Sequence, residues 1–549
     1  MMTGPAVTSH GRRGNRWRLI PVRFSPILGI SAVHHSFRSS LLLLAFFLAF
    51  LPVGLSAKVT VSPLFSDHMV LQRDMAVPIY GQATPMAKVT VQFRDQTKST
   101  TADAAGKWLL KLDALKAGGP DKLTISDGEP LILDDVLVGE VWVGSGQSNM
   151  QGSVSGYAKG DPVLAELAKK DYPTIRLSGS GGNWRVSNEK NNAGFSALLF
   201  SFGVRLQENL DVPIGLMQGA VGGTPSGFWL TQPMLDAHAP AKQNIARFAA
   251  TYNYEEQMKK HEAALVQWEK AAAEAKEKKA KIPAKPAAPI KPGESRGQIG
   301  NLFEKHIRAM VGYGIRGVVW DQGESGTAIQ GLDQYHAMGA LITGWRQAWG
   351  QGDFAFIHIQ KPSGDGPAWD KTNPVTNKAS DFAPLPAQVP GLRDGDYRDM
   401  HIRISNHPNT AMATASDLGA GIHPTNKSGY GTRASQVALG LVYGKKIAYY
   451  GPTYKAHTIE GNKVRITFNH VGQGLAYKHG DKLQGFALAG EDKVFHWADA
   501  TIDGDTVVLT SAKVTKPVAV RYAYASKHPW ANFFNKDGLP ALPFRTDAW

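Results

Sequence analysis

The chain has 549 residues, of which 43% are apolar and 19% are charged, a balance that excludes wholesale disorder and predicts about three or four domains. It contains no cysteine, which excludes disulfides, cysteine-ligated metals and a thiol nucleophile. The formal net charge is +14, but residues 1–57 carry six arginines and no acid, which leaves +8 for the remainder. The sequence has no basic stripe with interleaved aromatic residues, so we expect no nucleic-acid partner.

Residues 1–57 have the order of a secretory signal peptide. An arginine-rich opening precedes eleven consecutive apolar residues, 41–51, and small residues follow up to Ala57. The apolar run is shorter than the ~20 residues of a membrane-spanning helix, although an uncleaved anchor is the alternative. We therefore expect an exported protein, periplasmic or extracellular, with no stable membrane insertion after the signal is cleaved.

Two regions alternate apolar and polar residues in short runs separated by turn signals. The first covers residues 58–135 and the second residues 456–549. This spacing is typical of β-sandwiches, so both regions are predicted to be small β domains, and no residue of the first is expected to carry chemistry.

Residues 136–455 instead alternate buried-strand patterns with helical ones, which predicts an α/β domain with a parallel sheet. Polar loops follow several of the strands, so a functional site is expected at the carboxyl edge of the sheet. The predicted strands cover residues 136–143, 214–217, 315–320 and 354–359.

An insertion interrupts this domain within about residues 236–300. Its segment 255–292 is rich in alanine, lysine and glutamate, and it ends in four prolines. Such a composition predicts a surface helix or hairpin followed by a stiff extended linker. A solvated face is the favoured interpretation over a binding arm, and we assign the insertion no catalytic role.

Ser148 is the candidate nucleophile. It follows a buried strand within a Gly-Ser-rich turn, where a helix N-terminus and free amides stabilise an oxyanion. Met150 replaces the second glycine of G-x-S-x-G, which argues against an α/β-hydrolase elbow, and a plain tight turn is the alternative. Gly222 and Gln322 lie in loops after later strands and are candidate oxyanion donors, or else turn and loop residues.

His423 is the candidate general base. It lies between a Gly-rich turn and the predicted helix 429–443, in an exposed loop of the kind that carries function. Asp417 precedes it by six residues in the same segment.

The sequence contains four ordered blocks, GQSNMQ, PIGLMQGAVGGTPSGFW, RGVVWDQGES and DLGAGIHPTNKSGYGTRAS. These blocks resemble those of sialate O-acetylesterase-type enzymes, which are SGNH hydrolases with a flavodoxin-like α/β domain. The resemblance extends from about Val59 to the carboxyl end. It implies a serine nucleophile at Ser148, a base at His423, an oxyanion hole made by the amides of Ser148 and Gly222 with the Gln322 side chain, and no metal or cofactor.

The sequence departs from that family at the acid. SGNH enzymes often carry aspartate three residues before the histidine, and Ala420 occupies that position here. Either Asp417 reaches the imidazole to complete a triad, slightly the favoured interpretation, or the site is a Ser–His dyad.

The resemblance implies an acetylated carbohydrate as substrate, with sialic acid as the leading sugar. An acetylxylan or pectin-type deacetylase is an alternative within the same chemistry, and a non-catalytic carbohydrate-binding protein is one outside it. Trp229, Trp320 and Glu324 flank the site loops and are candidate substrate-binding residues, although the two tryptophans fit a hydrophobic core equally well.

Overall fold

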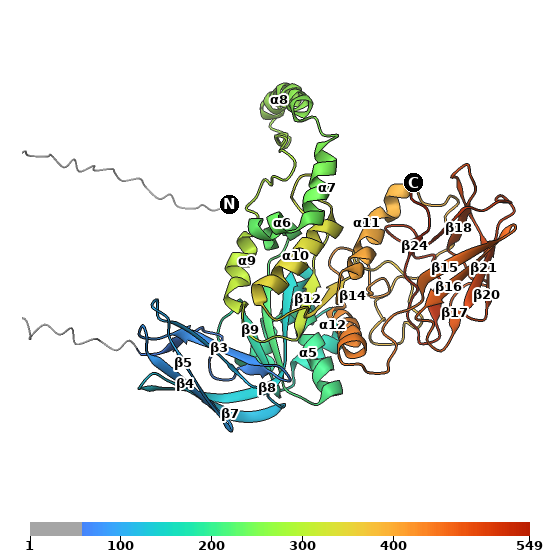
Figure 1. The fold of residues 1–549 in the computed structure, drawn as a ribbon. Helices are drawn as coiled ribbons and strands as arrows, with labels where there is room; N and C mark the ends of the chain where they lie inside the picture. Colours follow the sequence, from blue (N-terminus) through green and yellow to red (C-terminus); the bar gives the residue numbers. More distant parts are fainter. Residues whose placement is uncertain (1–57) are drawn as a thin grey trace, which may run out of the picture. The chain divides into compact units, whose positions relative to one another are not determined.

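The central element of the fold is one long strand, β8 (Pro130–Gly146), which crosses from an antiparallel region into a parallel sheet (Figure 1). The computed structural model describes residues 58–549, apart from the side chains of residues 392–394. The predicted signal peptide, residues 1–57, lies outside the described residues.

The two halves of β8 have different neighbours. Its first half pairs antiparallel with β7 (Gly118–Ser126), and its second half lies between the parallel strands β11 (Ile214–Ala220) and β12 (Gly317–Asp321). The predicted domain boundary at residue 135 therefore falls inside a single strand, and the N-terminal β region and the α/β region share it.

The parallel part of the sheet has the order β9-β11-β8-β12-β13-β14, and β10 adds antiparallel at one edge. The four strands predicted from buried apolar runs are confirmed as parts of β8, β11, β12 and β13. The remaining strands of this part are β9 (Tyr172–Gly179), β10 (Arg185–Ser187), β13 (Ala355–Ile359) and β14 (Thr410–Ala413).

Helices cover both faces of this sheet, because successive residues of its strands point to opposite sides. Trp142 of β8 packs with α5 and α12 in one core, while Val141 and Val143 join α9 and α10 in the other. The helices are α1 (Ser148–Gln151), α2 (Val154–Tyr157), α3 (Pro162–Ala168), α4 (Glu189–Ala193), α5 (Ala197–Leu210), α6 (Gln232–Ala237), α7 (Ala239–Ala249), α8 (Tyr254–Glu277), α9 (Asn301–His306), α10 (Gln334–Trp349), α11 (Leu392–Arg403) and α12 (Lys427–Val437).

Further strands flank the α/β region in sequence, and they pair antiparallel except β2 (Val70–Gln72), which pairs parallel with β8. The N-terminal strands share a continuous hydrophobic core with α10. Those strands are β1 (Thr60–Val61), β2 (Val70–Gln72), β3 (Val77–Gln82), β4 (Lys88–Phe93), β5 (Gln96–Thr101) and β6 (Lys107–Leu112).

The C-terminal region forms two four-stranded sheets, β15-β16-β21-β20 and β19-β18-β22-β24, around a core of their own. Its strands are β15 (Thr453–Glu460), β16 (Lys463–Asn469), β17 (Leu475–Tyr477), β18 (Phe486–Ala489), β19 (Phe495–Trp497), β20 (Asp499–Asp503), β21 (Thr506–Thr510), β22 (Ala519–Tyr522), β23 (Phe533–Asn535) and β24 (Phe544–Arg545).

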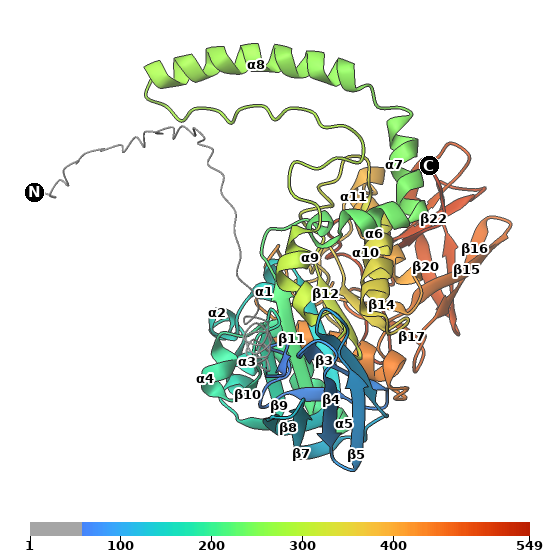
Figure 2. The same cartoon turned by 60° about the vertical axis from the view of Figure 1, so that its left-hand side comes forward.

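The predicted insertion forms an arm that Figure 2 shows standing apart from the sheet, with an extended return segment beside α8. No residue of α8 is buried. Trp268 Nε1 donates to the Pro283 carbonyl at 2.8 Å, which ties the helix to the return segment. Within residues 58–549, no helix is both long enough and apolar enough to cross a membrane.

Candidate active site

Ser148 lies at an abrupt turn from strand to helix. β8 ends at Gly146, and Ser148 is the first residue of α1. Gly146 has a φ of 123°, and a Cβ there would come within 2.1 Å of the Asp321 carbonyl oxygen, so the turn requires glycine. Gln147 N donates to the same carbonyl at 2.8 Å. The end of β12 thus fixes the turn and leaves Ser148 half-buried at the carboxyl edge of the sheet.

His423 faces the nucleophile. Its Nε2 lies 2.8 Å from Ser148 Oγ, although the two residues are 275 positions apart in the chain. For the hydroxyl to donate, Nε2 must be the unprotonated ring nitrogen and Nδ1 must carry the hydrogen. His423 is exposed, and its Nδ1 has no hydrogen-bond partner among residues 58–549. The pair has the geometry of a nucleophile with its general base.

Asp417 does not orient this histidine, so the expected triad is wrong in this structure. Its carboxylate is fully buried and binds Arg433 Nη2 of α12 at 2.6 Å. The chain between Asp417 and His423 turns outward through Gly419 and Gly421, which have φ values of 124° and 85°. The acid therefore stays in the core while the imidazole reaches the surface.

Two backbone amides lie near the nucleophile. Gly222 is close enough that a Cβ on it would lie 3.4 Å from Ser148 Cβ. Its N–H donates to Gln151 Oε1 at 2.8 Å. The Ser148 N–H, at the start of α1, has no hydrogen-bond acceptor among the described residues. The Ser148 amide is thus available to an oxyanion, whereas the Gly222 amide is occupied by the exposed side chain of Gln151.

Gln322 is not available as the third donor. Its side chain is fully buried, and Nε2 donates to the carbonyls of Gly326 and Thr224 at 3.1 and 3.4 Å. Its Oε1 accepts from Gln334 at 3.0 Å. Both amide hydrogens are therefore bound by backbone carbonyls of the site loops. Gln322 stabilises the loop that contains Gly222 and has no hydrogen left for an oxyanion.

Trp229 and Trp320 belong to the core, and the expectation that they stack on a sugar is wrong. Both are fully buried, and their rings pack edge to face with centroids 5.9 Å apart. Trp320 faces the α10 side of the sheet because β12 alternates. Trp229 Nε1 donates to Thr224 Oγ1 at 3.1 Å, so this tryptophan stabilises the loop that contains Gly222 and Thr224.

Glu324 lies under the nucleophile helix. Its carboxylate accepts hydrogen bonds from Gln147 and, at 3.3 Å, from Asn149. It also pairs with Lys361 Nζ at 2.8 Å. With 19% of its side chain exposed, Glu324 fixes the residues on either side of Ser148, and this structure gives no contact that assigns it to a substrate.

Sequence reasoning missed a buried polar cluster formed by Asn149, Lys361, Lys427 and Asp321. Lys361 Nζ pairs with the Asp321 carboxylate at 2.7 Å. Burial alone would lower the pKa of Lys361, but the carboxylates of Asp321 and Glu324 outweigh it and raise this pKa. Burial lowers the pKa of Lys427 to about 7. Both lysines are fully buried, whereas lysine is usually exposed, so composition alone offered no signal. In residues 58–549, no cluster of three or more His, Asp or Glu side chains is arranged to hold a metal ion.

Most of the chain is similar to sialate O-acetylesterases. It is 26% identical to that of Homo sapiens over 534 residues, covering 87% of this chain and 91% of the relative, and 26% identical to that of Mus musculus over 535 residues, covering 87% and 92%. A solved carbohydrate acetylesterase from Xanthomonas citri is 27% identical, with a TM-score of 0.67 over 89% of this chain and 100% of that one. No protein-family model matches. These similarities support a sialate O-acetylesterase-type family for the chain, and with it an enzyme that hydrolyses carboxylic esters.

Proposed function

We propose that this chain removes O-acetyl groups from acetylated sialic acid or related glycans through an acetyl-enzyme intermediate. The observation that supports this best is the 2.8 Å contact between Ser148 Oγ and His423 Nε2 at the carboxyl edge of a parallel sheet. Similarity to sialate O-acetylesterases over 87% of the chain supports the substrate class.

The reaction follows from this pair. His423 Nε2 takes the proton as Ser148 Oγ attacks the acetyl carbonyl carbon, and it returns the proton to the sugar oxygen when the ester bond breaks. His423 then takes a proton from the water that attacks the acetyl-serine and returns it to Ser148 Oγ as that ester bond breaks. The sugar leaves as an alcohol, and the acetyl group leaves as acetic acid, which ionises to acetate and gives its proton to the solvent.

The amides of Ser148 and Gly222 are the proposed oxyanion donors. The substrate oxygen would take the place of Gln151 Oε1 on the Gly222 N–H, which lies beside the nucleophile. Such donors stabilise the charge that develops on the carbonyl oxygen in the transition state. Since Asp417 pairs with Arg433, we propose a Ser148–His423 dyad.

The strand order supports an SGNH-type arrangement with one addition. If β9 is set aside, β11-β8-β12-β13-β14 follow the 2-1-3-4-5 order of flavodoxin-like sheets. β9 then extends this sheet beyond β11. The proposed nucleophile, Ser148, follows β8, which comes first of these five strands in the chain. The proposed base, His423, follows β14, which comes last.

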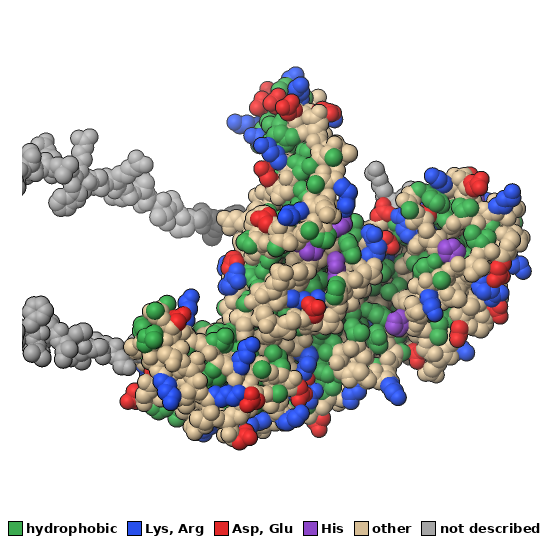
Figure 3. Space-filling view, in the orientation of Figure 1, with side chains coloured by type: hydrophobic (Ala, Val, Ile, Leu, Met, Phe, Trp, Pro, Cys, Tyr) green, Lys and Arg blue, Asp and Glu red, His purple; other side chains and the backbone are tan. Residues whose placement is uncertain are grey.

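We also propose that the enzyme is exported to the periplasm or the extracellular space, on the basis of the signal-like residues 1–57. The proposed partner is a carbohydrate and not a nucleic acid. Figure 3 shows basic and acidic side chains interspersed over the visible face, without a stripe of one sign.

The decisive experiment compares wild type with Ser148→Ala and His423→Ala on p-nitrophenyl acetate. Both variants should lose nearly all turnover while the free energy of unfolding changes by about 1 kcal/mol or less, because both residues are partly or fully exposed. Ser155→Ala, at an exposed serine of α2, is the matched control and should keep wild-type turnover.

A panel of acetylated sugars then separates the substrates. Acetate release from O-acetylated sialic acid supports the leading proposal, and release only from acetylated xylan or pectin favours a polysaccharide deacetylase. If the wild-type protein binds these sugars but releases no acetate, it is a binding protein. Wild-type turnover in Ser148→Ala would show that the nucleophile is another residue.

A further inference from the structure

The loop that carries His423 is held on both sides by one pair of buried side chains. Asn149 Nδ2 donates to the Ile422 carbonyl at 3.1 Å, and Lys427 Nζ donates to the Pro424 carbonyl at 2.6 Å. Lys427 Nζ also donates to Asn149 Oδ1 at 2.7 Å. The carbonyls immediately before and after the histidine are therefore joined to the residue that immediately follows the nucleophile.

We propose that Lys427 is a positioning residue, which acts with Asn149 to hold the imidazole of His423 against Ser148 in the absence of a carboxylate partner. The inference rests on the proposed function, since it assigns the two residues a role in the same reaction. The two clamped carbonyls fix the backbone on either side of the histidine, which leaves the ring little freedom to move away from Ser148 Oγ. Such alignment matters because a misplacement of about 1 Å can lower a rate by about 100-fold.

The environment of Lys427 indicates that this side chain does more than fill space in the core. Its side chain is fully buried, yet no carboxylate of the described residues lies within ion-pair distance of its Nζ. Besides the two oxygens that accept its hydrogen bonds, Lys427 Nζ lies over the rings of Tyr157 and Tyr430, 4.4 and 5.1 Å from their centroids. A buried ammonium without an ion pair is unfavourable to folding.

The charges around Lys427 act at longer range. Asp321, Glu324 and Asp161 raise its pKa and Lys361 lowers it, but burial is the largest influence and the net effect is downward. A residue that is unfavourable to bury and that joins two catalytic segments fits a positioning role.

A purely structural role is the competing explanation, because Lys427 is also the first residue of α12. Asp161 provides the matched control. It is buried and binds Ser428 N and Oγ, both at 2.7 Å, so it stabilises the start of the same helix without touching the histidine loop. Asp161→Asn should therefore loosen α12 without altering the alignment of His423.

The test measures kcat, KM and thermal unfolding for Lys427→Met and Asp161→Asn on p-nitrophenyl acetate. Lys427→Met keeps the aliphatic stem and removes Nζ, so kcat should fall about 100-fold while KM changes less than about threefold. Asp161→Asn should lower the unfolding temperature but keep kcat within about threefold of wild type. Equal losses of kcat in the two variants, or near-wild-type kcat in Lys427→Met, would overturn the proposal.

A double-mutant cycle identifies the residue through which Lys427 acts. In a His423→Ala background, Lys427→Met should cause no further loss in the rate at which a fluorophosphonate labels Ser148, because the group it positions is gone. A further loss as large as in the wild-type background would show that Lys427 acts elsewhere.

Two further outcomes keep the proposals separate. If Lys427→Met does not fold, Asn149→Asp is measured instead, since it keeps the acceptor for Lys427 but places an oxygen against the Ile422 carbonyl. Wild-type kcat in Asn149→Asp would also overturn the proposal that Asn149 and Lys427 position His423. Failure of the proposed function would appear differently, as wild-type turnover in His423→Ala itself.

Discussion

The buried pair of Asp417 and Arg433 shows how a single residue can be misjudged from its place in a motif. Asp417 is the one acid near His423 in sequence, but α12 brings Arg433 Nη2 to 2.6 Å from its carboxylate. Both side chains are buried, at 0% and 4% exposure, so the pair neutralises charge inside the fold. Separating such a pair leaves an uncompensated buried charge, which is strongly destabilising.

This pairing predicts the outcome of Asp417→Asn. The variant should lose about 3–5 kcal/mol of unfolding free energy because Arg433 is left without its carboxylate, while kcat of the folded enzyme falls less than about tenfold. Urea denaturation and initial rates on a small acetate ester measure the two effects. Arg433→Gln serves as the companion variant, and the double variant should be less destabilised than the sum of the singles. A loss of kcat near 10⁴ would restore the triad.

Among the elements, the arm formed by α8 and its return segment packs little against the rest of the protein. None of its 24 helical residues is buried, and its contacts to the return segment are local, as in the Trp268–Pro283 hydrogen bond. Figures 1 and 2 both show α8 away from the parallel sheet and its carboxyl edge.

Replacing residues 255–292 with a short Gly/Ser linker should therefore leave the chemistry intact. We expect kcat on p-nitrophenyl acetate within about twofold of wild type, because changing the length of a surface loop alters closure entropy only slightly. Circular dichroism of the purified variant confirms folding, and the helical signal should drop by the share of α8. Loss of turnover in a folded variant would mean that the arm shapes the site.

The elements show which parts of the molecule the sequence could predict. Buried apolar runs predicted β8, β11, β12 and β13, since strands covered on both faces are continuously apolar. Ser148 and His423 were identified because glycine-rich turns expose them. The orientation of Gln322 and the burial of Lys427 depend on contacts between segments more than 50 residues apart, which no local pattern encodes.

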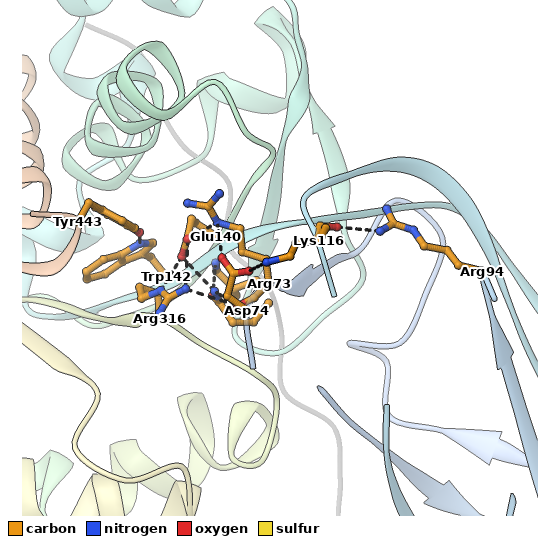
Figure 4. Close-up of polar contacts among 10 residues, drawn as sticks. Arg73, Asp74, Arg94, Lys116, Glu140, Trp142, Arg316 and Tyr443 are labelled. Atoms are coloured by element: carbon orange, nitrogen blue, oxygen red, sulfur yellow. Dashed lines mark hydrogen bonds and ion pairs between the residues drawn. The ribbon is translucent and has the colours of Figure 1, made fainter. Parts of the chain in front are cut away.

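At the scale of the whole molecule, Glu140 joins three segments. It is fully buried on β8 and accepts from Arg73 at 2.6 Å, Arg316 at 2.8 Å and Gln72 at 3.0 Å. Figure 4 shows the side chains of Arg73 and Arg316 converging on it. The N-terminal strands and the parallel sheet therefore meet at a buried ionic centre as well as at a hydrophobic core.

Glu140→Gln should consequently destabilise the entire described unit. Two arginines would face an uncharged group, and we expect a loss of about 3–5 kcal/mol in a single cooperative urea transition. Asp113→Asn, which removes the pair between Lys98 and a carboxylate whose side chain is 78% exposed, is the control and should change stability by about 0.5 kcal/mol or less. Equal effects of the two changes would argue against a stabilising role for the buried centre.

Three buried histidines of the described residues should make stability depend on pH. Burial lowers the pKa of His358 to about 3 and those of His401 and His528 well below their ordinary value. In the unfolded chain each titrates near 6.5, so the unfolded state binds more protons below that pH and stability falls as the pH drops from about 6.5 to 5. Each group contributes up to about 1.4 kcal/mol per pH unit.

Urea midpoints at pH 7.5, 6.0 and 5.0 measure this slope. His528→Gln should reduce the change in unfolding free energy per pH unit by about the contribution of one buried histidine. A midpoint that stays constant between pH 7.5 and 5.0 would show that these rings are protonated in the folded state.

The length of β8 has a consequence for how this protein folds and how it can be divided. The first half of this strand pairs antiparallel with β7, its second half lies between β11 and β12 in the parallel sheet, and α1, which begins at Ser148, follows its end. A cut near residue 135 would leave two exposed sheet edges, each able to recruit other chains. The N-terminal strands are therefore poorly suited to act as a transferable module, and a hinge between them and Ser148 would require a hydrogen-bonded strand to break.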